Sequence, residues 1–86
     1  MPEVSRFHGI VVAIFSREHL PPHFHAAWGG RELRVNILTG EVLSGGFPPA
    51  QERLVLAWWK LHRDELLADW TLAQDHRPLF RIAPLG

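Results

Sequence analysis

The sequence predicts an α+β fold: a small antiparallel β-meander of about four strands, packed on one face by a long C-terminal helix or a broken helix pair. Two observations support this class. In the first half of the chain, extended apolar runs are separated by glycine-containing turn signals, which is typical of consecutive hairpins. In the second half, apolar residues recur every three or four positions, which is the period of a helix. We find no linker or internal repeat, so we expect residues 1–86 to form a single domain.

The first strand is predicted over residues 7–15, where the sequence reads FHGIVVAIF. This run is rich in β-branched and aromatic residues on both alternating faces, which is typical of an interior strand. The segment SREHLPP follows as a connection. Its two prolines favour extended geometry, so the chain is expected to be stiff where it reaches His23.

The segment HFHAAWGGRELRVN predicts a hairpin with Gly29-Gly30 as its turn, because the tightest hairpin turns need positive φ angles. This register pairs His23 with Asn36 and His25 with Arg34. One face then carries the apolar set Phe24, Ala26, Trp28, Leu33 and Val35, and the other carries His23, His25, Ala27, Glu32, Arg34 and Asn36. We expect the second set to lie on the face that the helix does not cover.

A second tight turn is predicted at Thr39-Gly40, between the runs RVNIL and EVLSGG. This turn would pair Ile37 with Val42 on the apolar face. Together with the preceding elements, it gives a meander of about four strands with one apolar side.

The helix is predicted over residues 49–75, beginning in the segment FPPAQE. Proline is tolerated in a first helical turn, and an apolar stripe follows at steps of three and four. We expect a bend or break near Arg63-Asp64. The tail PLFRIAPL is expected to add an edge strand or to lie over the end of the helix.

Composition and charge exclude several classes of protein. The chain has no cysteine, which excludes a disulfide framework and thiolate metal sites. Its nine basic and nine acidic residues cancel, whereas a protein held on nucleic acid by nonspecific phosphate contacts normally has a basic excess. The longest apolar run, Ile10–Phe15, is too short to span a bilayer. We therefore expect a cytoplasmic protein that does not insert into membranes.

Three of the six histidines lie within the sequence HLPPHFH, residues 19–25. In a strand, His23 and His25 point the same way, and the predicted register sets Arg34 and Asn36 opposite them. This polar face would suit an anion or a phosphodiester. Three interpretations of the cluster remain open.

The first interpretation is a metal-independent ribonuclease, with RNA as the substrate. One imidazole of His23 and His25 would act as general base and the other as general acid, because both titrate near neutral pH. Arg34 would stabilise the charge that develops on the phosphate, and Asn36 would help to bind the ligand.

The second interpretation is a divalent transition-metal site, for zinc or nickel. His23 and His25 would be ligands, with His19 or Glu18 folding back as the third. The preferred metal set is His19, His23 and His25, although no acidic residue is clearly placed to support these imidazoles from behind. In the third interpretation, the histidines are hydrogen-bonded residues of a surface that a partner or a second copy of the chain covers.

Several blocks of the sequence are also similar to a known family. They are SRFHGIVVAIF, EHLPPHFHA, the doubled glycine, GEVLSG, LVLAWWKLHRDELLADWTLA and PLFRIAPL. Together they resemble a bacterial domain-of-unknown-function family, number four-one-six-zero in that series. This family has no agreed activity. Its members resemble short stand-alone proteins encoded beside another small domain, which implies a two-gene, toxin–antitoxin-like module that binds a small companion protein.

The resemblance also bears on the helix. By periodicity alone, His62 is expected to be a core or boundary residue within an apolar stripe. The family pattern, however, includes the positions of His19, His23, His25 and His62, and its helix motif includes Arg63. The resemblance therefore implies one site that joins sheet and helix, with His62 and Arg63 as ligand-binding residues. A purely structural homodimer is the contrasting expectation.

Overall fold

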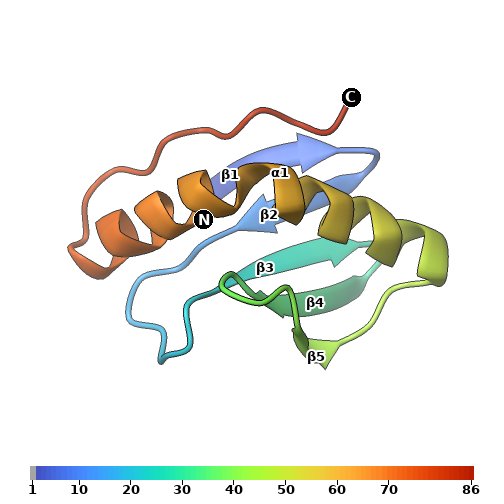
Figure 1. The fold of residues 1–86 in the computed structure, drawn as a ribbon, viewed down its shortest axis with the longest axis horizontal. Coiled ribbons are helices and arrows are strands. Elements are labelled where there is room, and N and C mark those ends of the chain that lie inside the picture. The colour runs from blue at the N-terminus through green and yellow to red at the C-terminus, as the bar shows by residue number, and fades with distance from the viewer. Residues whose placement is uncertain (1) are drawn as a thin grey trace.

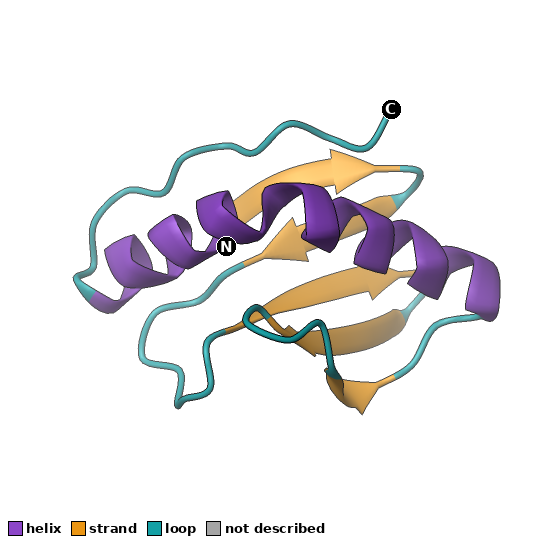
Figure 2. Ribbon diagram, in the orientation of Figure 1, coloured by secondary structure: helices purple, strands orange, loops and turns teal. Residues whose placement is uncertain are grey.

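The computed structural model describes residues 2–86, which form one antiparallel sheet and one long helix. The strands lie across the sheet in chain order, β1-β2-β3-β4-β5. They are β1 (Glu3–Phe7), β2 (Ile10–Ala13), β3 (His23–Trp28), β4 (Arg31–Asn36) and β5 (Val42–Gly45), and the helix is α1 (Pro49–Gln74). The helix lies across one face of the sheet (Figure 1, Figure 2). The predicted α+β class is confirmed.

The prediction of one strand over residues 7–15 is wrong, and the described sheet has five strands rather than about four. The chain reverses at His8 and Gly9, whose φ angles are 50° and 76°, so that Phe7 pairs with Ile10. Glycine adopts a positive φ at little cost, which makes this turn physically reasonable. Both arms of the hairpin are largely buried, and their continuous apolar character hid the turn between them.

The β3–β4 hairpin has the predicted register. Gly29 and Gly30 form the turn with φ angles of 55° and 77°. All six predicted pairs are present, from Trp28 with Arg31 to His23 with Asn36. The apolar set is fully buried at Phe24, Ala26, Leu33 and Val35 and partly buried at Trp28.

The turn between β4 and β5 is wider than predicted, and the pairing of Ile37 with Val42 is wrong. Val42 instead pairs two positions closer to the start of β4. The reason is Asn36, whose N–H donates to the carbonyl of Glu41 at 2.8 Å. Its side-chain Oδ1 also accepts a hydrogen bond from the N–H of Leu38 at 2.8 Å. This is the local side-chain turn that asparagine favours.

Helix α1 confirms the predicted span to within one residue, and it is kinked at His62, where φ is −124° and ψ is 22°. The kink lies one residue before the predicted break. The buried apolar side chains of the helix are Val55, Trp58, Leu66, Trp70 and Ala73. No helix within residues 2–86 combines the length and apolar character that crossing a bilayer requires.

The C-terminal tail runs beside β1 rather than over the helix end (Figure 1). The N–H of Ile82 donates to the carbonyl of Val4 at 2.8 Å, and Ile82 is buried. The indole N–H of Trp58 donates to the carbonyl of Ala83 at 2.8 Å, which ties the tail to α1. The tail thus closes one edge of the sheet without forming a regular strand.

Candidate functional site

The histidine cluster lies where the connection from β2 enters β3. This connection carries Glu18, contains a cis peptide bond between Leu20 and Pro21, and delivers His23 as the first residue of the strand. The ring centroids of His23 and His25 are 5.3 Å apart. That separation is expected of alternate residues on one side of a strand.

His23 is buried, with 3% of its surface exposed. Its ring centroid lies 5.3 Å from that of Trp70, because the last turns of α1 reach over the start of β3. The expectation that both imidazoles lie on the uncovered face is therefore wrong for His23. Its Nδ1 lies 2.8 Å from the carbonyl oxygen of Pro21. Since a carbonyl only accepts, Nδ1 carries a proton, and in the neutral ring Nε2 carries a lone pair.

The Nε2 atom of His23 is the unusual feature of this region. It is buried and has no hydrogen-bond partner among the residues that the structure describes. Most buried polar atoms in proteins have a partner, so an exception calls for a physical explanation.

His25 is partly buried and lies between two carboxylates. Its Nε2 is 2.5 Å from Oε1 of Glu18, and its Nδ1 is 2.8 Å from Oε1 of Glu32. The edge of its ring packs against Phe15, with the centroids 4.7 Å apart. Both ring nitrogens of His25 are therefore held by acidic side chains.

Glu18 joins the two histidines into one group. Its Oε1 lies 3.6 Å from Nε2 of His23 and 2.5 Å from Nε2 of His25. One ligand atom from each of the three residues lies within 4.8 Å of the other two. Burial opposes ionisation of the Glu18 carboxyl, but the hydrogen bond with His25 and the closeness of both imidazoles outweigh it, so the pKa of Glu18 is below its usual value.

Arg34 and Asn36 pair with the two histidines as predicted, but their side chains differ in what they can bind. The Nε–H of Arg34 donates to Oγ of Ser44 at 2.8 Å. The side-chain oxygen of Asn36 is already used by the β4–β5 turn. Asn36 is thus explained by a structural role, whereas Arg34 keeps terminal N–H groups for a ligand.

The cluster lies between two hollows in the surface. A groove of about 380 Å³ is lined by Glu18, His19, Leu20, Pro21, His23, Arg34 and Leu43. A hollow of about 200 Å³ on the other side of the cluster is lined by Val11, Ala13, Phe15, His25, Ala26, Ala27 and Glu32. Glu18 and His23 therefore line a groove whose polar residues also include Arg34.

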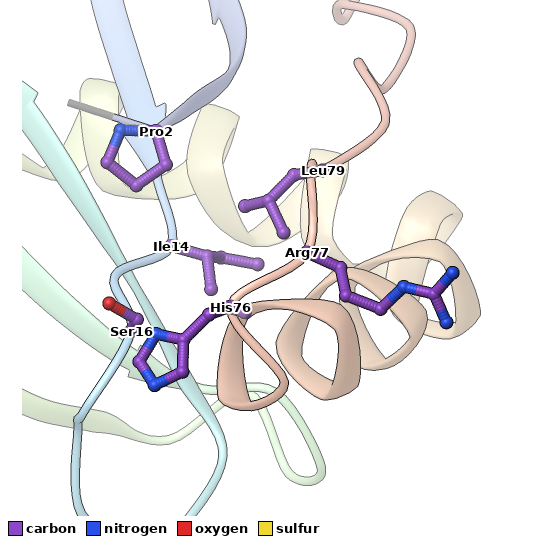
Figure 3. Close-up of a pocket in the computed structure, with 7 residues that line it drawn as sticks. Pro2, Ile14, Ser16, His76, Arg77 and Leu79 are labelled. Atoms are coloured by element: carbon purple, nitrogen blue, oxygen red, sulfur yellow. The ribbon is translucent and has the colours of Figure 1, made fainter.

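A further hollow of about 250 Å³ lies beside the C-terminal end of α1 (Figure 3). Ile14 and Leu79 supply apolar lining, and Ser16 and His76 supply polar groups. Arg77 points away from the other labelled side chains. None of the lining residues belongs to the histidine cluster.

The two predicted helix residues make their contacts elsewhere. Nδ1 of His62 lies 2.6 Å from Oε1 of Glu65, and its ring centroid lies 5.5 Å from that of Trp58. The Nε–H of Arg63 donates to the carbonyl of Leu38 at 3.1 Å, which ties α1 to the β4–β5 turn. These contacts favour a boundary position for His62 and a structural role for Arg63.

Sequence reasoning named Glu18 only as an alternative to His19 and did not recognise the roles of Glu32 and Trp70. The structure gathers Glu18 with the histidine pair, while His19 is exposed and outside that group. Glu32 was available from the register, because it is a diagonal cross-strand neighbour of His25 on the same face. Trp70 could not be found in this way, because its contact with His23 depends on how α1 packs against the sheet.

A known family model covers the part of the chain that forms this site. The model described as a domain of unknown function (DUF4160) matches residues 9–71. The chain belongs to this family. The matched range contains all the residues of the histidine cluster and most of α1, which confirms the resemblance seen in the sequence. Comparison with curated proteins and with solved structures gives no match. The geometry of the cluster is therefore the main guide to function.

Proposed function

We propose that this DUF4160 protein binds a divalent transition-metal ion through Glu18, His23 and His25. The observation that supports this most strongly is Nε2 of His23, which is buried without a hydrogen-bond partner and lies 3.6 Å from Oε1 of Glu18. A buried polar atom without a partner costs about 1–3 kcal/mol. A metal ion would remove this cost by using the lone pair as a ligand.

The donor set suits such an ion. Two imidazole nitrogens and one carboxylate oxygen bind zinc in some hydrolases and iron(II) in non-haem oxygenases. Each histidine also has the contact that ligating imidazoles usually make through their other nitrogen. The carbonyl of Pro21 supports His23, and the carboxylate of Glu32 supports His25. Glu32 is the supporting acidic group that the sequence-based interpretation missed.

The three ligand atoms lie within 4.8 Å of one another, so none of their separations has to shrink by more than about 1.5 Å to bind an ion. Ligand atoms that are bound at about 2.0–2.1 Å to a tetrahedral ion lie about 3.3 Å from one another. Oε1 of Glu18 lies 3.6 Å from Nε2 of His23 and 2.5 Å from Nε2 of His25. The carboxylate would therefore move away from His25 by roughly 1 Å. The short contact requires a proton on Nε2 of His25, and metal binding would release that proton.

The same contacts favour a metal site over a metal-independent ribonuclease. A general base must reach the substrate proton directly or through one water molecule. Nε2 of His23 is buried, and both nitrogens of His25 contact carboxylates. An RNA substrate would first have to displace Glu18 or Glu32. RNA cleavage by His23, His25 and Arg34 therefore remains a prediction.

Three further expectations also remain predictions. They are a small companion protein within a two-gene, toxin–antitoxin-like module, a homodimer, and a cytoplasmic location. Co-expression with the neighbouring gene tests the first of these. A stable complex on size-exclusion chromatography is expected, and separate elution of the two proteins would contradict it.

Metal binding is tested by titrating zinc into protein purified without a polyhistidine tag. Zinc at about 100 times its Kd would stabilise the fold by about 2.7 kcal/mol. For a domain of this size, the corresponding rise in Tm is about 10–20 °C. Calorimetric titration should give one zinc per chain, and no zinc binding by the wild-type protein would overturn the proposal.

Two neighbouring substitutions separate the proposed ligand set of Glu18, His23 and His25 from the set of three histidines. Glu18→Gln should abolish the zinc-dependent rise in Tm, because an amide oxygen is a poor zinc ligand. His19→Ala should leave the rise unchanged, because His19 is exposed and outside the group. The reverse result would show that His19 is the third ligand. Circular dichroism without zinc confirms that each variant is folded.

A further inference from the structure

The groove beside the proposed metal centre contains a cation, Arg34, that forms no salt bridge within residues 2–86. Arg34 is partly buried, and its Nε–H is fixed by Oγ of Ser44 at 2.8 Å. The contact with Ser44 orients the guanidinium while its terminal N–H groups remain available to a ligand.

We infer that this groove binds the phosphate group of a small phosphate ester, which Arg34 and the metal ion hold together. This inference rests on the proposed function, because it requires the ion. A guanidinium presents paired N–H groups that match two oxygens of a phosphate. Three protein ligands leave a coordination position of the ion open, and an oxygen of the same phosphate can occupy it.

The charges that line the groove make this binding depend on the metal. Without an ion, the same lining carries the guanidinium of Arg34 and the carboxylate of Glu18, whose charges are opposite. A divalent ion leaves the groove with a clear positive excess. An anion should therefore bind the metal-loaded protein and bind the metal-free protein weakly.

The apolar part of the lining favours an ester over free phosphate. Leu20, Pro21 and Leu43 line the same groove, whose volume is about 380 Å³. This space is larger than one phosphate group fills. An apolar or aromatic group attached to the phosphate would cover the three side chains and add contact area.

Cobalt-loaded protein allows metal and phosphate binding to be measured separately. The visible absorption of bound cobalt(II) reports on its coordination. Phenyl phosphate should change this spectrum and should bind more tightly than inorganic phosphate. Acetate should bind more weakly than either. Tighter binding of acetate would overturn the assignment to phosphate, and an unchanged spectrum with phenyl phosphate would overturn the inference while leaving metal binding intact.

Substitutions in the groove test the role of Arg34. Arg34→Gln should weaken phenyl phosphate binding about tenfold or more, with unchanged cobalt affinity. Ser44→Ala keeps the guanidinium but removes its anchor, so a smaller loss is expected. Arg31→Gln is the matched control, because Arg31 lies on the same strand and is exposed outside this groove. Equal binding by the Arg34 and Arg31 variants would overturn the inference, whereas loss of cobalt binding by the wild-type protein would overturn the proposed function itself.

Discussion

Within residues 2–86, three buried side-chain polar atoms have no hydrogen-bond partner: Oγ of Ser5, Nε2 of His23 and Oδ2 of Asp69. The two that belong to ionisable groups, His23 and Asp69, differ in their surroundings. At the start of β3 the atom is Nε2 of His23, and on α1 it is Oδ2 of Asp69. Around His23, the ligand atoms of Glu18 and His25 lie within 4.8 Å. The other carboxyl oxygen of Asp69, Oδ1, accepts a hydrogen bond from the N–H of Phe80 at 2.9 Å.

The difference shows two ways in which a fold can tolerate such an atom. Burial raises the pKa of Asp69, the hydrogen bond from Phe80 opposes this, and the nearby charge of Glu65 adds to the rise. The carboxyl can therefore become neutral by binding a proton. Nε2 of His23 instead faces an ionised carboxylate and a second imidazole, a set of groups that a metal ion can join. The surrounding donors, rather than burial itself, distinguish a candidate site from a structural group.

The largest expected effect comes from removing a ligand of the proposed metal site. His23→Gln removes an imidazole ligand and should reduce zinc affinity by more than the 10–100-fold that a supporting residue typically contributes. His62→Gln removes a partly buried histidine of α1, whose Nδ1 lies 2.6 Å from Oε1 of Glu65. This second variant should bind zinc like the wild-type protein. Isothermal titration of both variants measures the difference, and equal losses would contradict the distinction between the two regions.

A smaller effect is expected at the residue that supports His25. Glu32→Gln removes the carboxylate 2.8 Å from Nδ1 of His25 and should weaken zinc binding about 10–100-fold. Glu65→Gln is its counterpart on the helix, where the carboxylate contacts His62 alone among the histidines. Its zinc affinity should remain that of the wild-type protein. Competition with a chromogenic chelator gives both values, and an unchanged affinity in Glu32→Gln would show that this contact does not support a ligand.

The fold was predictable where local patterns were unambiguous. The Gly29-Gly30 turn and the alternation on either side of it predicted every pair of the β3–β4 hairpin. The pattern failed at His8, because two buried strands joined by a short turn resemble one long apolar strand. It also failed at Asn36, whose side chain enlarges a turn in a way that glycine position alone does not indicate.

The candidate site was predictable only in part, for a related reason. Alternation along β3 predicted that His23 and His25 lie together, and this is observed. Which residue of the preceding loop meets them depends on the path of the connection, and the structure brings Glu18 rather than His19. The burial of His23 depends on how far α1 extends past the sheet. Both are relations between elements, and the pattern within one element does not contain them.

The smallest effect is expected on the helix, where the pKa of Asp69 is raised above its ordinary value of 3.8. The folded protein then binds a proton here more readily than the unfolded chain does. Stability from this group is fully present below the unfolded pKa and declines as the pH rises through the folded pKa. Asp69→Asn removes the titration and keeps an oxygen that can accept from Phe80.

The free energy of unfolding of Asp69→Asn, relative to that of the wild-type protein, should therefore increase as the pH is raised from about 4 to 7. Urea denaturation at several pH values measures this trend. Asp64→Asn is the exposed control on the same helix, since 99% of the Asp64 side chain is exposed. Asp69→Leu should follow the same trend but should be less stable than Asp69→Asn by about 1–3 kcal/mol at every pH, because the Phe80 N–H loses its acceptor. A difference in the free energy of unfolding that does not change with pH would mean that Asp69 is not stabilised by binding a proton. The contrast with His23 would then depend only on the ligand atoms around His23.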